Sequence, residues 1–301
     1  MNYMKRELCE KNRVAWNEAT VYHQKARNQS LQDGFADPHF TVFDRDCDSV
    51  LIEKLHQIDV KNKVVAQLPC NNGRELLSIV KMGAEKGIGF DISDAAIAEA
   101  NELKAIAGLN VDFHRTNLLD INDSFNGTVD FIYISEGSLQ WFSSLNDYFK
   151  IVSKLLKPNG ELLIYEIHPF AYFFEPANDL AKEPALDDFI PYFEKGPYSF
   201  KNGLDYVGQT AYPAKECCWY MHKISDILNA IIANGLEIEQ IDEYNTEMAN
   251  NERIKNTEKF PLSYILQCRK SISCFLRFSV KFAQITGMFL VIYTNFTNFA
   301  V

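Results

Sequence analysis

Short apolar runs alternate with stretches of helical periodicity along the chain from residue 64 onward. A buried strand shows a short apolar run, whereas an amphipathic helix repeats its apolar positions every three or four residues. Their alternation is typical of βαβ units, so the pattern predicts an α/β fold around a parallel sheet. The runs that we interpret as strands cover residues 64–68, 86–90, 110–114, 129–134, 161–167, 236–241 and 262–267.

Turn residues mark where the intervening helices should end. Gly83 and Gly108 follow the first two helical stretches, and glycine takes the left-handed conformation past a helix end without strain. After the third, the run 157–160 (Lys-Pro-Asn-Gly) predicts a turn, because Pro presets φ while Asn and Gly tolerate positive φ. The predicted helices cover residues 74–82, 94–107, 145–156 and 223–234. A closing hairpin completes a Rossmann-like, mostly parallel sheet of seven strands with helices on both faces and the last strand antiparallel.

The first 59 residues have a different pattern, which predicts a helical cap before a domain that spans residues 60–270. Residues 13–20 and 50–55 form short amphipathic stretches, and a polar loop with Gly34 and Pro38 separates them.

Two other segments interrupt the alternation. Residues 168–215 are rich in Pro, Phe and Tyr and are too long for a simple connection, so we expect an inserted lid over the substrate. The tail 271–301 is apolar and has no charge after Lys281. It could be a membrane anchor, a peripheral packed segment or an extension outside the domain, and its polar residues weigh against the anchor.

Composition limits the classes of partner. The chain has 301 residues, 47% of them hydrophobic and 23% charged, which is ordinary for a soluble globular protein. Its net charge of −10 argues against a nucleic acid, because binding to phosphates needs clustered Lys and Arg. A small-molecule substrate is the partner we expect.

The cysteines indicate a cytoplasmic protein. They are seven, without a C-x-x-C pair, which predicts reduced thiols. The N-terminus has no apolar segment typical of a secretory signal. No spacing of His, Cys or acidic residues predicts a metal site.

The turn after the first strand is the first candidate for chemistry. Gly73 opens the next helix, and Asn71 and Asn72 stand where glycines often lie in nucleotide-binding loops. Asn visits the left-handed region more readily than most residues, so this loop can still turn tightly. Taken alone, the segment is equally consistent with a plain strand-to-helix turn.

Asp91 strengthens the interpretation as a cofactor site. It ends the second strand about twenty residues after the turn, where an acid binds ribose hydroxyls in dinucleotide folds. The alternative is that Asp91 only caps the following helix. Because Ser93 and Asp94 are also available as caps, the ribose role is favoured.

These motifs resemble those of the class I S-adenosylmethionine-dependent methyltransferases. The stretches 117–120 and 130–137 and the run 155–162 (Leu-Leu-Lys-Pro-Asn-Gly-Glu-Leu) also match, and the resemblance covers about residues 60–270. The first motif departs from the family's glycine-rich consensus at 69–73 (Pro-Cys-Asn-Asn-Gly). A bacterial small-molecule subgroup looks similar in this loop, in Trp16-Asn17 and in 168–170 (His-Pro-Phe).

The resemblance implies S-adenosylmethionine as the cofactor and assigns residues to it. The methionine part would contact the first loop and the end of the fourth strand, Asp91 the ribose, and Ile92, Asn117 and Leu118 the adenine. Glu136 could bind the ammonium group, or it could be a solvated acid at a strand end. The cofactor-binding residues so implied are Cys70, Asn71, Gly73, Asp91, Ile92, Asn117, Leu118, Ser135 and Glu136.

Aromatic and histidine side chains are the candidates for the substrate pocket, since aromatic faces attract a sulfonium. For any single one of the aromatic residues, ordinary core or lid packing is the favoured alternative. His168 is the candidate base, because it follows the fifth strand at the edge where α/β sites gather, although a structural role is as consistent. The pocket candidates are Trp16, Tyr22, His23, Trp141, Tyr192, Tyr198, Trp219 and His222.

Three functions follow from these features. The first is a methyltransferase for a small molecule. The second is a non-catalytic protein that binds S-adenosylmethionine or S-adenosylhomocysteine. The third, an NAD-dependent oxidoreductase, is disfavoured because the G-x-G-x-x-G spacing is absent.

Overall fold

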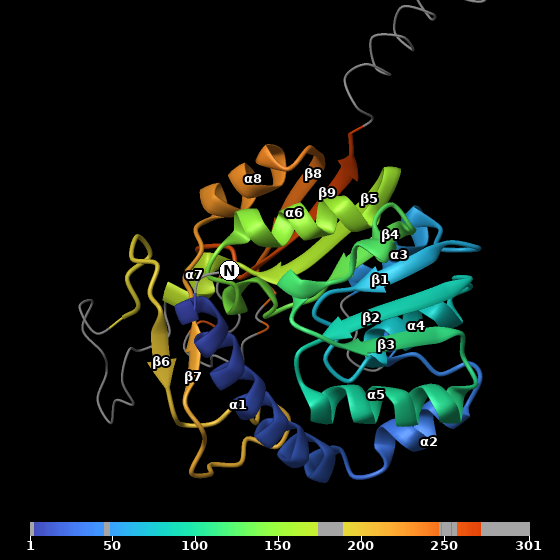
Figure 1. The fold of residues 1–301 in the computed structure, drawn as a ribbon, viewed down its shortest axis with the longest axis horizontal. Coiled ribbons are helices and arrows are strands. Elements are labelled where there is room, and N and C mark those ends of the chain that lie inside the picture. The colour runs from blue at the N-terminus through green and yellow to red at the C-terminus, as the bar shows by residue number, and fades with distance from the viewer. Residues whose placement is uncertain are drawn as a thin grey trace, which may run out of the picture.

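A twisted sheet of seven strands forms the centre of the protein (Figure 1). The computed structural model describes residues 3–44, 49–173, 189–246, 248, 254 and 258–271. The strand order is β3-β2-β1-β4-β5-β9-β8, and β9 runs antiparallel to both of its neighbours. The predicted fold class is therefore confirmed. The strands are β1 (Val64–Gln67), β2 (Lys86–Asp91), β3 (Val111–Arg115), β4 (Val129–Ile134), β5 (Leu156–Ile167), β8 (Leu236–Tyr244) and β9 (Ser263–Lys270).

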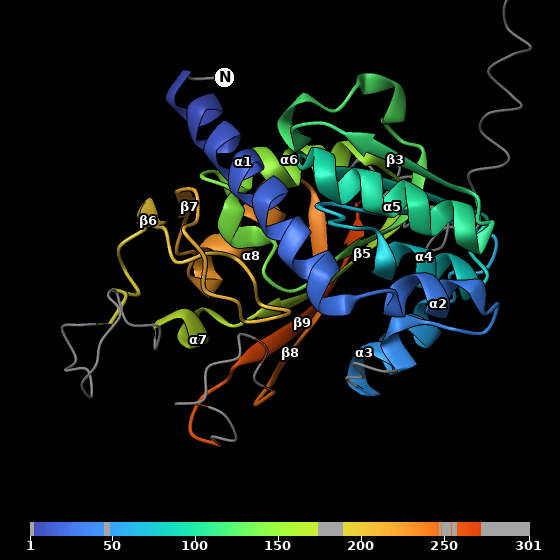
Figure 2. The ribbon, with the colours of Figure 1, turned by 90° about the horizontal axis from the view of Figure 1, so that it is seen from below.

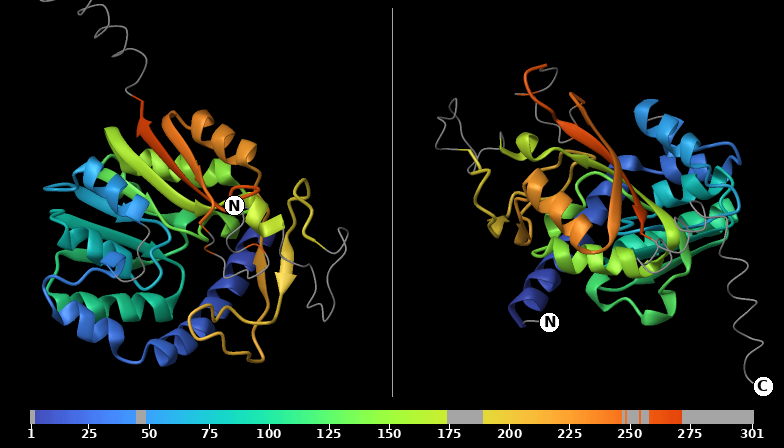
Figure 3. Two further views of the ribbon diagram at one scale, coloured as in Figure 1. Left: turned by 180° about the vertical axis from the view of Figure 1, so that it is seen from behind. Right: turned by 90° about the horizontal axis from the view of Figure 1, so that it is seen from above.

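Helices cover both faces of this sheet, as Figure 3 shows from behind and from above. On one face, α6 (Leu145–Leu155) and α8 (Ile224–Ala233) bury their apolar sides in one core with residues of β4, β5 and β9. The opposite face is covered by four helices, whose leucines and phenylalanines form a second core with Phe131 and Tyr133. They are α2 (Ser30–Ala36), α3 (Ser49–Ile58), α4 (Arg74–Lys81) and α5 (Asp94–Ala107).

The N-terminal cap is more helical than the sequence predicts. Instead of a short helix over 13–20, α1 spans Tyr3–Arg27 and packs along α5 and the strand β7 (Cys217–Trp219). The polar loop expected around Gly34 is also wrong, because Gly34 lies inside α2. A Cβ at Gly34 would come 2.7 Å from the Phe40 ring, so glycine lets α2 pack closely there.

A bulge replaces the turn that the sequence predicts at residues 157–160. Strand β5 already begins at Leu156, which pairs with Val129, and pairing resumes between Glu161 and Phe131. The four residues between are accommodated opposite Asp130, with Asn159 at φ +63°. Lys157 keeps the bulge in place through bonds of 2.8 Å from its Nζ to both oxygens of Asp130.

The insert after β5 lies over one end of the sheet. It contains α7 (Pro169–Phe173) and β6 (Tyr198–Phe200), and β6 pairs with β7 in a small antiparallel sheet that the sequence did not predict. Figures 1 and 2 both show this sheet beside α1. The short 3-10 helices are Val42–Asp44, Leu118–Asp120, Asp123–Phe125 and Leu139–Trp141.

No helix among the described residues is long and apolar enough to cross a membrane. The tail 272–301, for which the sequence left three interpretations open, lies outside the described residues.

Candidate active site

The loop between β1 and α4 turns as tightly as the sequence predicts. Asn71 has φ +47° and Gly73 has φ +71°, the left-handed region that these residue types tolerate. A Cβ on Gly73 would overlap the Phe113 ring, so only glycine fits there. Cys70 donates its N–H to the Phe90 carbonyl over 2.9 Å, which fixes the loop to the end of β2.

Asp91 lies beneath this loop and connects it to α5. One carboxylate oxygen accepts a bond of 2.9 Å from the Asn71 N–H, and the other accepts one of 2.8 Å from the Ser93 N–H. Burial raises the pKa of Asp91, and the backbone donors oppose that rise. The cap of α5 is Ser93, whose Oγ accepts from the Ala96 N–H over 3.1 Å. Asp91 is therefore not the cap, and its carboxylate faces a cavity.

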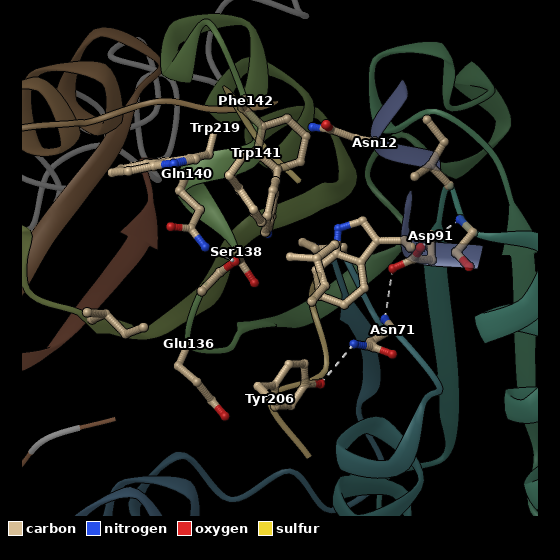
Figure 4. Close-up of a pocket in the computed structure, with 18 of the residues that line it drawn as sticks. Asn12, Asn71, Asp91, Glu136, Ser138, Gln140, Trp141, Phe142, Tyr206 and Trp219 are labelled. Carbon is tan, nitrogen blue, oxygen red and sulfur yellow. Dashed lines mark hydrogen bonds between the residues drawn. The ribbon is translucent and has the colours of Figure 1, made fainter. Parts of the chain in front are cut away.

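One cavity of about 980 Å³ extends from Asp91 to the inserted segment. Figure 4 shows Asn71 and Asp91 on one side of it and Trp219, Gln140 and Ser138 on the other. Cys70 and Gly73 do not line the cavity. They determine the conformation of the loop, through the Cys70 N–H bond to Phe90 and the packing of Gly73 on Phe113. Of the residues implied for the cofactor, those that line the cavity are Asn71, Asp91, Ile92, Asn117, Leu118, Ser135 and Glu136.

Helix α1 forms a wall of the cavity and is anchored at the start of α5. The Asn17 Oδ1 accepts bonds from the Ser93 Oγ at 2.8 Å and the Ala95 N–H at 3.2 Å. Arg13 forms an ion pair with Asp94. These contacts place Trp16, one turn from Arg13, against the cavity with its ring 5.4 Å from that of Trp141.

Asn12 connects α1 to the inserted sheet, and sequence reasoning missed it. Its buried amide donates to the Cys218 carbonyl and accepts from the Cys218 N–H, both over 2.8 Å. The side chain thus pairs with β7 as a neighbouring strand would. No local signal marks this role, because the partner lies 206 positions away.

Tyr206 closes the cavity beside the cofactor loop and was also missed. Its hydroxyl accepts a bond of 3.3 Å from the Asn71 Nδ2 (Figure 4), and its ring lies 4.5 Å from that of His23. The Asp205 carboxylate holds the surrounding loop by accepting from the N–H groups of Gly208 and Thr210, at 2.8 and 3.0 Å.

The turn after β4 carries Glu136 and is held by a second carboxylate. Glu166 is buried and accepts hydrogen bonds from the N–H of Gly137, of Ser138 at 2.9 Å and of Leu139 at 3.0 Å. Burial raises the pKa of Glu166 to about 7, although these donors favour its charged form. Burial, together with the charge of Glu75, raises the pKa of Glu136 to about 8.

Four of the eight predicted pocket residues line the cavity, namely Trp16, Trp141, Tyr198 and Trp219. All four come from α1, the turn after β4 and the small sheet of β6 and β7, so the fold brings together aromatic rings that are distant in the sequence. Trp219 lies 5.0 Å from the Tyr198 ring and 5.6 Å from the Tyr172 ring.

The other four predicted pocket residues have structural contacts outside the cavity lining. Tyr22 stacks on Tyr212 with ring centroids 3.9 Å apart. The His23 Nε2 donates to the Leu204 carbonyl, and the His222 Nε2 to the Phe142 carbonyl, each over 2.8 Å. The Tyr192 hydroxyl accepts a bond of 3.4 Å from the Ile224 N–H.

His168 also lies outside the cavity lining. Its Nδ1 accepts a bond of 3.1 Å from the Phe170 N–H, so Nε2 carries the proton and donates to Glu243 over 3.1 Å. Burial lowers the pKa of this histidine. Nε2 therefore ties the end of β5 to β8, and Nδ1 is engaged by the backbone of α7. This geometry favours the structural role over that of a base.

Comparisons with known proteins agree with this architecture. A family model described as a methyltransferase domain matches residues 65–160. A S-adenosylmethionine-dependent methyltransferase of Mesorhizobium loti is 20% identical, with a TM-score of 0.55 over 74% of this chain and 99% of that one. Another, from Clostridium acetobutylicum, is 17% identical, with a TM-score of 0.54 over 77% of this chain and 95% of that one.

Sequence relatives match only in part. An uncharacterized protein of Rickettsia prowazekii is 32% identical over 106 residues, which are 34% of this chain and 19% of that protein. The chain aligns with less than half the length of the curated relatives it matches.

Residues 65–160 therefore match a methyltransferase domain model, and the fold around them is shared with S-adenosylmethionine-dependent methyltransferases. These matches agree with the family resemblance drawn from the sequence, and the two similar structures are described as S-adenosylmethionine-dependent enzymes.

Proposed function

We propose that this protein transfers the methyl group of S-adenosylmethionine to a small molecule inside the cavity. The observation that carries this proposal is the continuity of the cavity, from Asn71 and Asp91 to Trp219. A site for group transfer must hold donor and acceptor in one enclosed space and in line.

The chemistry of the first end fits an adenosyl cofactor. The Asp91 carboxylate keeps lone pairs beyond its two backbone bonds, and these suit ribose hydroxyls. Ile92 and Leu118 offer apolar contacts for the adenine, while Asn71 and Ser135 face the space for the methionine part. When bound, the cofactor supplies an activated methyl group on a sulfonium, which the nearby rings of Trp16 and Trp141 would favour.

The second end fits a small acceptor. Pockets for small ligands commonly have about 300–1,000 Å³, so a cavity of about 980 Å³ has room for a cofactor and an acceptor together. Helix α1 and the inserted sheet cover it, which favours a molecule that enters whole over a polymer. The net charge of −10 weighs against nucleic acid.

Titration calorimetry with S-adenosylhomocysteine, and with NADH as the control ligand, tests the cofactor. We expect micromolar or tighter binding of S-adenosylhomocysteine and none of NADH. Release of labelled methyl groups from S-adenosylmethionine to a metabolite mixture then tests the reaction. Binding without transfer would identify a non-catalytic binding protein, and absence of binding would overturn the proposed function.

A further inference from the structure

Glu136 lies where the two ends of the cavity meet. It follows β4, which pairs with β1, so its neighbour across the sheet edge is the loop that carries Asn71. Ser135 precedes it on the cofactor side, and Ser138 and Gln140 follow it toward the aromatic end. In Figure 4 it lies with Ser138 and Gln140, across the cavity from Asp91.

The Glu136 carboxylate is also the acidic group of the cavity that no other part of the proposed site uses. Among the described residues that line the cavity, Asp91 and Glu136 are the two acids. Both oxygens of Asp91 accept backbone N–H groups, and their remaining lone pairs are assigned above to the ribose hydroxyls. Glu136 forms no hydrogen bond or ion pair with another side chain in the part of the chain that the structure describes, so it can serve a ligand.

The surroundings of Glu136 suit proton transfer. It is half-buried, and burial is the largest cause of its raised pKa. The charges near it are those of Glu75, Glu166 and Arg74, of which the two acids raise its pKa and Arg74 lowers it. The phenol of Tyr133 is the other titratable group close to it. The resulting pKa of about 8 makes the Glu136 carboxylate a stronger base than an ordinary glutamate, and its deprotonated form becomes populated as pH rises toward 8.

Glu166 fixes the position of this base. Its carboxylate binds the three consecutive N–H groups of residues 137–139, and it also accepts from the Ile167 N–H over 2.8 Å. The backbone directly after Glu136 is therefore tied to the end of β5. A base held in this way needs no rearrangement at the moment of reaction.

We propose that Glu136 is the general base of the reaction and that the acceptor is an aromatic molecule with an O–H or N–H group. This inference rests on the proposed function. The acceptor's proton moves to a carboxylate oxygen of Glu136, and the freed lone pair of its O or N forms the new bond to the methyl carbon. The bond from that carbon to sulfur breaks, and its electron pair stays on sulfur.

The aromatic character of the acceptor follows from the second end. Tyr198 and Tyr172 lie beside Trp219 there, and Trp141 faces it from the turn after β4. Ile167 and Ile190 complete an apolar lining that would bury a flat ring. Lys201 is the one cation among the described lining residues, and its side chain is exposed.

Glu136→Gln tests the base, with the exposed Glu85→Gln as the matched control. The first group of acceptors is aromatic and carries an O–H or N–H group: 1-naphthol, indole and 8-hydroxyquinoline. The second group lacks either the proton or the aromatic ring: 1-methoxynaphthalene, cyclohexanol and trimethylamine. We expect methylation within the first group alone and a loss of about 100-fold or more in kcat for Glu136→Gln. The Kd of S-adenosylhomocysteine should stay within threefold of the wild type in both variants.

The outcomes separate the two proposals. If S-adenosylhomocysteine binds but no protic aromatic compound is methylated, or an aprotic or aliphatic one is, the acceptor class is overturned. If Glu136→Gln weakens that binding tenfold or more, the residue holds the cofactor's ammonium group and is not the base. If S-adenosylhomocysteine does not bind the wild type, the proposed function itself fails.

Glu75→Gln gives a readout that a structural role would not change. Removing the charge of Glu75 lowers the pKa of Glu136. The rising limb of the pH–kcat profile should therefore move to lower pH by roughly 0.5–1 unit. An unmoved limb would overturn the role of Glu136 as the base.

Discussion

The two ends of the cavity are built in different ways. The cofactor end consists of strand ends and of one short loop, whose conformation depends on positive φ at Asn71 and Gly73 and on the buried Asp91. The acceptor end is assembled from α1, the turn after β4 and the inserted sheet, joined by side chains such as Asn12. The cofactor end is formed by the sheet and its connecting loop, whereas the acceptor end is formed by segments that pack onto the sheet. Damage to each end should therefore have a different signature.

The largest loss of stability should come from Gly73→Ala. The alanine would be strained at φ +71° and its Cβ would overlap Phe113, which together should cost about 2–5 kcal/mol of unfolding free energy. Gly108→Ala is the matched control, since φ is +63° there but the space is open, and it should cost about 1 kcal/mol. Urea denaturation measures both, and equal losses would show that the contact with Phe113 is unimportant.

Trp219→Ala should damage the acceptor end alone. Removing this ring opens the wall shared with Tyr198 and Tyr172, so kcat/KM for the acceptor should fall by roughly 10- to 100-fold. The Kd of S-adenosylhomocysteine should change less than twofold. A parallel loss of both would contradict the division of the cavity into two ends.

Asn12→Ala should loosen the inserted sheet. It removes two hydrogen bonds to Cys218 in a buried setting, which should cost about 1–3 kcal/mol. Hydrogen exchange at 217–219 should rise, whereas exchange in β1 and β4 should stay the same. Asn101→Ala, which removes one bond to the Ile97 carbonyl, is the control and should leave 217–219 protected.

The smallest effect concerns acid pH. Burial lowers the pKa of His23 from 6.5 to about 4, so the unfolded chain takes up a proton before the folded protein does. The stability due to neutral His23 is present above pH 6.5 and is lost as pH falls from 6.5 toward 4. His23→Gln should have a lower Tm at pH 7.5 and a smaller further loss at pH 5. An identical slope of Tm with pH in both proteins would contradict this account.

The same division explains what the sequence could predict. The strand ends at Gln67, Asp91 and Ile134 follow from apolar runs, and the loop follows from Asn and Gly, all within a few positions. Here local chemistry determines the structure. Residues 94–107 likewise form a helix with the predicted ends, because Ser93 and Gly108 cap it.

The acceptor end depends on contacts that no local pattern encodes. Asn12 and Glu166 act through partners that lie 206 and up to 29 positions away. Tyr206, beside the cofactor loop, likewise acts through a partner 135 positions away. His168 lies at the sheet edge where sites of α/β proteins gather, yet both of its ring nitrogens form hydrogen bonds, to Phe170 and Glu243. Half of the residues predicted for the pocket line the cavity. The sequence does not distinguish the others, because a tyrosine or histidine can serve either packing or binding.

The Kd of S-adenosylhomocysteine for Asp91→Ala tests the central claim most directly, with the exposed Asp123→Ala as the control. We predict a loss of tenfold or more for Asp91→Ala, because the carboxylate both faces the cavity and holds the Asn71 loop. Asp123→Ala and Trp219→Ala should stay within twofold of the wild type. An unchanged Kd in Asp91→Ala would contradict the placement of the cofactor at this end of the cavity.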